Sequence, residues 1–182
     1  MTPQILISTE DTVLVFIDCQ DEFISGLTSI DARALTNSWL ALAKFAVERR
    51  VPVVTTVMEI SNFEVDGRSH LHPLFPDTEA IARVALNPWD DKPFTQTIAA
   101  KARQRLVLAG AYTEGAITFA ALSALREGYD TYVVRDASVG KTDADHETAV
   151  ARMMQAGVVP VTHRQLLLEW GRNDPPSGNG RS

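Results

Sequence analysis

Continuous apolar segments that alternate with helical stretches dominate the hydrophobic pattern of this chain. The segments are apolar at successive positions rather than at every second one, which predicts strands buried on both faces of a parallel sheet. They cover residues 12–17, 51–57, 106–109, 131–134 and 158–162. Helix-like periodicity falls between them, over residues 30–48, 114–127 and 143–155. This alternation predicts an α/β fold with three α/β/α layers around a parallel central sheet.

Gly128 and Gly157 follow two of the expected helices, where a left-handed cap is needed.

Two segments depart from the alternation of strands and helices. Residues 60–76 form a long polar connection, of the length that functional lids often have. Residues 171–182 read GRNDPPSGNGRS, which is too poor in apolar residues to order itself. We therefore expect one domain over residues 1–170 and a disordered tail over residues 171–182.

Composition narrows the class of protein. The formal charge of −6 argues against nucleic-acid binding, which relies on cationic surface. No apolar run approaches the roughly 20 residues of a membrane-spanning helix, and no secretory signal is visible at the start. We expect a soluble cytoplasmic protein with neither nucleic acid nor membrane as a partner. Cys19, the single cysteine, has no partner for an intramolecular disulfide.

Polar residues follow the apolar segments, and ligands of open parallel sheets bind at that edge. Asp18, Glu59 and Asp136 each lie at or just beyond the end of an expected strand. Asp18 is the sharpest case, because a carboxylate directly after an apolar run is costly to bury unless it is paired or used. The alternative is that Asp18 caps the turn that follows it.

The third expected strand leads into a helix whose first turn lies near Thr113 to Ala116. Unpaired N–H groups at such a turn bind carboxylates and oxyanions and activate thiolates. Gly115 and Ala116 have no side chain that could attack a substrate, and neither Thr113 nor Thr118 has an evident base nearby in the sequence. The residues alone therefore give no support for covalent catalysis.

Several segments together resemble the isochorismatase-like hydrolases. VLVFIDCQDEF resembles the first-strand motif of that family, and LAGAYTEGAITFAALSALREGYDTYVVRDAS resembles its third strand, nucleophile helix and fourth strand. FPDTEAIARVALNPWDDKPF and MMQAGVVPVTHRQLLLEW are similar to the YcaC-like branch. The matching segments cover most of residues 11–170.

The resemblance implies where the family's catalytic triad would lie. Asp18 falls on the aspartate, Arg83 on the cation and Ala116 on the cysteine, with Lys92 as a second candidate for the cation. Cys19 does not replace the missing thiol, because neighbouring residues of a strand point to opposite faces and Cys19 should face away from Asp18. Family members also carry a cis peptide before the helix, here between Tyr112 and Thr113.

Further residues follow from the resemblance as the lining of a substrate site. They are Gln20, Phe23, Glu59, Trp89, Tyr112, Thr113, Gly115 and Ile117. Some relatives, the nicotinamidases, bind a metal near the second strand, but their Asp-x-His pattern is not matched after Thr56. We expect no metal and no cofactor, and we expect the four histidines to be surface or capping residues. They are His70, His72, His146 and His163.

The resemblance implies a hydrolase, and the absent thiol narrows its chemistry. True isochorismatases hydrolyse a vinyl ether with a carboxyl group as general acid, which Asp18 would supply while Arg83 holds a substrate carboxylate or Asp18 itself. A neighbouring arginine lowers the pKa of an aspartate, which opposes that use unless burial raises it. Two alternatives stay open: an inactive ligand-binding or assembly protein, and a Cys-to-Ala knockout of an amidohydrolase. The related branch also implies a homo-oligomer.

Overall fold

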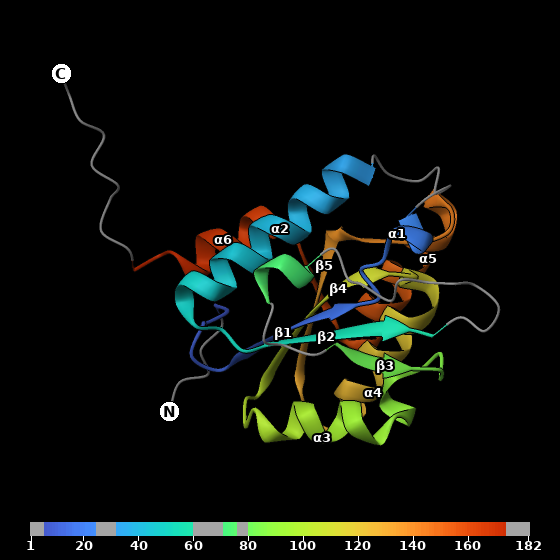
Figure 1. Cartoon of the computed structure of the whole chain (residues 1–182), viewed down its shortest axis with the longest axis horizontal. Helices are drawn as coiled ribbons and strands as arrows, with labels where there is room; N and C mark the ends of the chain where they lie inside the picture. The colour runs from blue at the N-terminus through green and yellow to red at the C-terminus, as the bar shows by residue number, and fades with distance from the viewer. Residues whose placement is uncertain (1–5, 25–31, 60–70, 76–79, 174–182) are drawn as a thin grey trace.

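A parallel sheet lies at the centre of the computed structural model, which describes residues 6–24, 32–59, 71–75 and 80–173 (Figure 1). The sheet has six strands in the order β3-β2-β1-β4-β5-β6, and every neighbouring pair is parallel. This confirms the expected fold class. The strands are β1 (Thr12–Ile17), β2 (Val53–Met58), β3 (Ile81–Arg83), β4 (Arg105–Ala111), β5 (Asp130–Val139) and β6 (Val159–Val161).

The helices cover both faces of the sheet. In Figure 1, α2 and α6 lie side by side above it, and α3 and α4 lie below. Each face has its own buried cluster, one around Trp39, Phe16 and Trp170, the other around Phe94, Ile17 and Met153. In the described ranges, no helix is long and apolar enough to cross a membrane. The helices are α1 (Asp21–Ile24), α2 (Ala32–Arg49), α3 (Lys92–Ala100), α4 (Thr118–Arg126), α5 (Asp143–Ala156) and α6 (His163–Trp170).

The strand order places a switch point at the centre of the sheet. From β1 the chain builds outward through β2 to β3, then returns to β4 on the other side of β1 and continues to β6. Loops at the carboxyl ends of β1 and β4 therefore diverge in opposite directions, which is where open α/β sheets bind ligands. Asp18 follows β1 and Tyr112 follows β4, so both lie at this point.

The structure differs from the sequence-based expectation in three respects. The strand β3 was not expected, because its three residues are too few to give an apolar run. The short helices α3 and α6 were also not expected. Strand β5 extends beyond residue 134 through a shift in its register with β4 between Leu108 and Gly110. The left-handed caps at Gly128 and Gly157 are confirmed, with φ of 90° and 108°.

Two predicted segments lie mostly outside the described residues. Of the polar connection over residues 60–76, the structure describes residues 71–75, which include a short 3₁₀ helix at His72–Leu74. Of the tail, it describes residues 171–173. The expectations of a lid and of a disordered tail remain predictions.

Gly110 fixes the close approach of β4 to β1 beside the switch point. Its φ is 139°, a region that side chains rarely adopt, and a Cβ placed there would lie 1.9 Å from the carbonyl oxygen of Ile17. Ile17 and Gly110 are register partners, so that oxygen belongs to the residue directly before Asp18. A side chain at position 110 would therefore push the end of β1 out of place.

We expect Gly110→Ala to lower the free energy of unfolding by about 3 kcal/mol or more, from backbone strain and overpacking together. Gly128→Ala is the matched control, because Gly128 also has positive φ but a Cβ at that position would have nothing within 4 Å of it. The control should lose only about 1 kcal/mol. Urea unfolding measures both; equal losses would contradict the importance of the contact with Ile17.

Candidate active site

Asp18 leaves β1 in a left-handed conformation, with φ of 50°. Aspartate tolerates this region better than most residues. Along β1, Leu14 and Phe16 pack on the α2–α6 side, and strict alternation would place Cys19 on the opposite side. The turn at Asp18 breaks this alternation, so that Cys19 lies in the same cluster as Phe16.

Cys19 is fully buried in the packing of the sheet, as predicted, although the left-handed turn and not simple alternation puts it there. Burial, together with the charge of Asp18, raises the pKa of the Cys19 thiol well above its ordinary value. The thiol is therefore protonated at neutral pH, and it is neither accessible nor nucleophilic.

The Asp18 carboxylate is fully buried and is held by side chains from the two strands beyond β1. One oxygen pairs with the Arg83 guanidinium at the end of β3, and the other accepts a hydrogen bond of 2.8 Å from the Thr56 hydroxyl on β2. The same hydroxyl oxygen lies 3.2 Å from the backbone nitrogen of Asp18 and 3.4 Å from Nε of Arg83. Three neighbouring strands thus contribute to one polar cluster.

Arg83 is held by this cluster and by the chain that follows β3. Its second terminal nitrogen donates to the carbonyl oxygens of Ala85 and Leu86, the latter at 3.2 Å. Lys92, the other candidate cation, is exposed at the start of α3. Of the two, Arg83 is therefore the residue that neutralises Asp18.

Burial raises the pKa of the Asp18 carboxyl above that of an ordinary aspartate. Desolvation is the largest effect, and the opposing effects of the Arg83 charge and of the Thr56 hydrogen bond do not cancel it. The conflict that the sequence left open is thus decided in favour of burial. A carboxyl group of this kind retains its proton to a higher pH than an exposed one.

The chain after β4 makes a π-helical turn at Thr113–Ile117, and this turn leads directly into α4. Tyr112 is left-handed, with φ of 58°, and its carbonyl oxygen accepts from the N–H groups of Gly115 at 3.0 Å and Ile117 at 3.3 Å. Two donors of the expected anion cradle are therefore already used. The expected cis peptide between Tyr112 and Thr113 is wrong, since every peptide bond in the described ranges is trans.

Ala116 and Thr113 are both fully buried in this turn. Ala116 belongs to the cluster on the α3–α4 side of the sheet. The Thr113 hydroxyl lies 2.9 Å from Nδ1 of His146 on α5, a partner that no sequence motif revealed because 33 residues separate the two. Burial lowers the pKa of His146, which is therefore neutral at neutral pH.

Three other predicted site residues connect the segments that follow the strands at this edge of the sheet. The Gln20 side chain accepts from the N–H of Met58 at 2.8 Å and donates to its carbonyl at 3.4 Å, which ties the end of β1 to β2. Phe23 packs edge-on against Tyr112, with ring centroids 5.1 Å apart. Glu59 is exposed beyond β2, and its N–H donates to the carbonyl of Arg83 at 2.9 Å.

Trp89 and Asp136 lie apart from the Asp18 cluster. The Trp89 ring is buried against Phe94 and Tyr129, and Tyr129 precedes β5 at the opposite end of the strands. The Asp136 carboxylate accepts from the backbone nitrogen of His163 at 2.7 Å and lies 2.7 Å from its ring nitrogen. Asp136 therefore binds the first N–H of α6, whose N-cap is Thr162, and His163 does not have the capping role expected of it.

Among the described side chains, no group of three or more His, Cys, Asp or Glu residues could hold a metal ion. His70 lies outside the described residues, and so does the side chain of His72.

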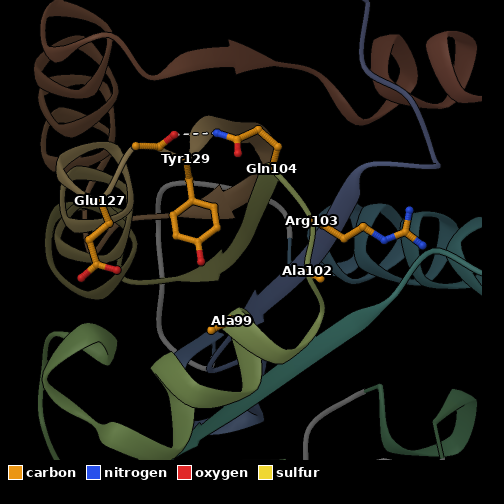
Figure 2. A pocket seen from close by; sticks show the side chains of 7 residues that line it. Ala99, Ala102, Arg103, Gln104, Glu127 and Tyr129 are labelled. Atoms are coloured by element: carbon orange, nitrogen blue, oxygen red, sulfur yellow. Dashed lines mark hydrogen bonds between the residues drawn. The ribbon is translucent and has the colours of Figure 1, made fainter.

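A hollow of about 460 Å³ opens at the opposite end of the sheet, between the end of α3 and the start of β5 (Figure 2). The Gln104 side chain donates to the carbonyl of Gly128 at 2.6 Å beside it. This hollow contains none of the predicted site residues. Its lining is Ala99, Ala102, Arg103, Gln104, Glu127, Gly128 and Tyr129.

We expect Arg83→Met to lower the free energy of unfolding at pH 7 by about 3–5 kcal/mol, because it leaves a buried carboxylate unpaired. The loss should shrink as the pH falls, since a protonated Asp18 needs no counter-ion. Lys92→Met is the control and should change stability by less than about 0.5 kcal/mol. Urea unfolding at several pH values measures both; a loss in Arg83→Met that does not depend on pH would contradict the pairing.

Comparisons with known proteins show which family and fold this chain shares. A family model for the isochorismatase domain matches residues 12–165. The chain is 32% identical over 165 residues to the probable hydrolase YcaC of Escherichia coli, an alignment that covers 88% of this chain and 77% of that protein. The crystal structure of the E. coli YcaC gene product, described as an octameric hydrolase of unknown specificity, has a TM-score of 0.86 at 30% identity.

That match covers 95% of this chain and 85% of the E. coli chain. YcaC from Pseudomonas aeruginosa, solved with hexane-2,5-diol and covalent acrylamide, has the same TM-score of 0.86 at 28% identity and covers 95% of this chain and 86% of its own. A nicotinamidase from Bacillus subtilis, at 17% identity and a TM-score of 0.72, shares the fold. The chain belongs to the isochorismatase family of hydrolases.

Proposed function

We propose that this protein hydrolyses a small carboxylated substrate, a vinyl ether of the isochorismate type, with Asp18 acting directly as the general acid. The observation that carries the proposal is the buried Asp18 carboxyl, whose pKa is raised although Arg83 lies against it. A general acid is most effective when its pKa lies near the working pH, and burial moves Asp18 in that direction.

The proposed reaction needs no covalent intermediate. The Asp18 carboxyl transfers its proton to the enol-ether carbon, and water adds to the resulting oxocarbenium ion. The hemiketal then breaks into pyruvate and an alcohol, and a proton from the water returns to Asp18. In this proposal Arg83 holds Asp18 itself, through a guanidinium that also donates to Ala85 and Leu86.

A substrate would contact the polar and aromatic residues around the switch point. Phe23 and Tyr112 would form one wall through their edge-on packing, and Glu59 would form a charged rim. Gly115 and Ile117 are buried and their N–H groups already donate to Tyr112, so they would shape the turn rather than contact the substrate. Gln20 and Thr113 would act by packing and orientation. Trp89 packs against Tyr129 at the other end of the strands and has no part in this site.

Substitution of Asp18 tests the proposal. With isochorismate and a panel of small carboxylated vinyl ethers as substrates, Asp18→Asn should lower turnover by about 10²–10⁴-fold, the usual contribution of a general acid. Wild-type turnover should fall as the pH rises through the raised pKa of Asp18, because only the protonated carboxyl is an acid. Mass spectrometry of the products measures both.

Asp90→Asn, an exposed aspartate on the short turn before α3, is the matched control and should keep full turnover. Circular dichroism establishes that Asp18→Asn remains folded. Unchanged turnover in folded Asp18→Asn would refute the role of Asp18. Ligand binding without any conversion by the wild type would favour the binding-protein alternative.

A thiol hydrolase whose nucleophile is replaced by alanine is the second candidate function. It is favoured by the position of Ala116 in the buried π-helical turn at the switch point, after β4. On this model, Ala116→Cys restores hydrolysis of small amides, nitriles or ureido compounds, measured as released ammonia. Wild-type protein is the control, and an inactive Ala116→Cys across the panel would remove this candidate.

We also propose that the chain forms a homo-oligomer. The support is the octameric E. coli YcaC and the exposed apolar side chains of Val84 and Leu86 beside the edge strand β3. Light scattering tests this proposal by measuring the mass of the protein in solution.

A further inference from the structure

The start of α5 is attached to the π-helical turn by two side-chain contacts. The Thr113 hydroxyl lies 2.9 Å from Nδ1 of His146, and the Glu114 carboxylate accepts from the backbone nitrogen of Lys141 at 3.1 Å. The turn follows β4, whereas Lys141 and His146 follow β5. The two contacts therefore join the loops of neighbouring strands at the same edge of the sheet.

Gly140 makes this attachment close. A Cβ at position 140 would lie 2.8 Å from a Glu114 carboxylate oxygen and 2.9 Å from the backbone nitrogen of His146. The loop before α5 therefore lies directly on the π-helical turn, with no room for a side chain between them.

The turn needs such support because it begins in a strained conformation. Tyr112 has φ of 58°, and a bulky residue persists there only when its surroundings hold it. Thr113 is the link, since its carbonyl accepts from the Thr118 hydroxyl at the start of α4 while its own hydroxyl reaches His146. Fixing Thr113 thus fixes the turn that carries Ala116.

We propose that His146 is a positioning residue of the candidate active site: in its neutral form, Nδ1 accepts the Thr113 hydroxyl and holds the π-helical turn in place. Its effect on turnover rests on the proposed function; its effect on the turn does not.

The surroundings of His146 make this contact sensitive to acid. Burial is the largest influence on its pKa and lowers it, and Arg135 on β5 acts in the same direction. The carboxylates that face it oppose this; they are Glu147 and Asp143 on α5 and Glu114 on the turn. Both ring nitrogens of a protonated histidine are donors, so the Thr113 hydroxyl then loses its acceptor.

The sign of the pH effect follows from this. An unfolded histidine has a pKa of about 6.5, and that of folded His146 is lower, so the unfolded state binds more protons between the two values. The stabilising contribution of neutral His146 is therefore complete above about pH 6.5 and is lost as the pH falls through the lowered pKa.

Hydrogen–deuterium exchange of the amides over residues 113–118 tests the proposal on the full-length chain. Thr113→Val keeps the shape of the side chain and removes the hydroxyl; it should raise exchange roughly fivefold, the size expected from losing one neutral hydrogen bond. His146→Leu should raise it equally, and the double variant should add little to either. Thr113→Ser should restore wild-type protection.

The second measurement is the pH dependence of the same amide exchange. After correction for intrinsic exchange, protection in the wild type should fall below about pH 6.5, and His146→Leu should lack this step. Arg152→Gln, an exposed residue on α5 that is not among the charges acting on His146, is the control and should keep the step. Additive effects in the double variant, or an acid step that persists in His146→Leu, would overturn the proposal.

Turnover separates this inference from the proposed function. If the wild type hydrolyses a vinyl ether, the low-pH fall in kcat/KM should disappear in His146→Leu together with the exchange step. A wild type that hydrolyses nothing refutes the proposed function, while the exchange measurements still decide the role of His146.

Discussion

Asp18 and Arg83 form an ion pair with both side chains fully buried, and the edge of the sheet around the candidate site depends on it. Removing two charges from water is unfavourable, so such a pair persists only where further hydrogen bonds satisfy it. Thr56 serves the carboxylate and two backbone carbonyls serve the guanidinium. The pair therefore fixes the ends of β1, β2 and β3 relative to one another, and the same desolvation raises the pKa of Asp18.

The part of the site that follows β4 depends on backbone geometry more than on charge. Gly110 lets β4 approach Ile17, and the left-handed Tyr112 then turns the chain into the π-helical turn. His146 and Glu114 connect that turn to α5. The ends of β1 to β3 are thus held by a buried ion pair. The turn after β4 is held by close packing and by hydrogen bonds in which at most one partner is charged.

Sequence patterns predicted the layers of the fold because a strand buried on both faces must be apolar throughout, as residues 12–17 are. They also singled out Asp18, because a carboxylate after such a run is costly to bury unless it is paired or used. They did not predict β3, whose three residues have no periodicity, or the contact between Thr113 and His146, which lie 33 residues apart in the chain. The burial of Cys19 was predicted correctly, but the side of the sheet that alternation assigns to it was wrong, because alternation cannot anticipate a left-handed residue.

The shortness of β3 affects how the protein responds to acid. It lies at the edge of the sheet and pairs with β2 alone through three residues, so it is among the elements with least local support. Arg83 is its last residue, and fraying of β3 withdraws the only charge paired with Asp18 in the described structure. While β1 and β2 stay paired, the carboxyl remains desolvated without its counter-ion, and its pKa rises further. Fraying of this edge is therefore coupled to proton uptake by Asp18, and acid makes the frayed state more populated.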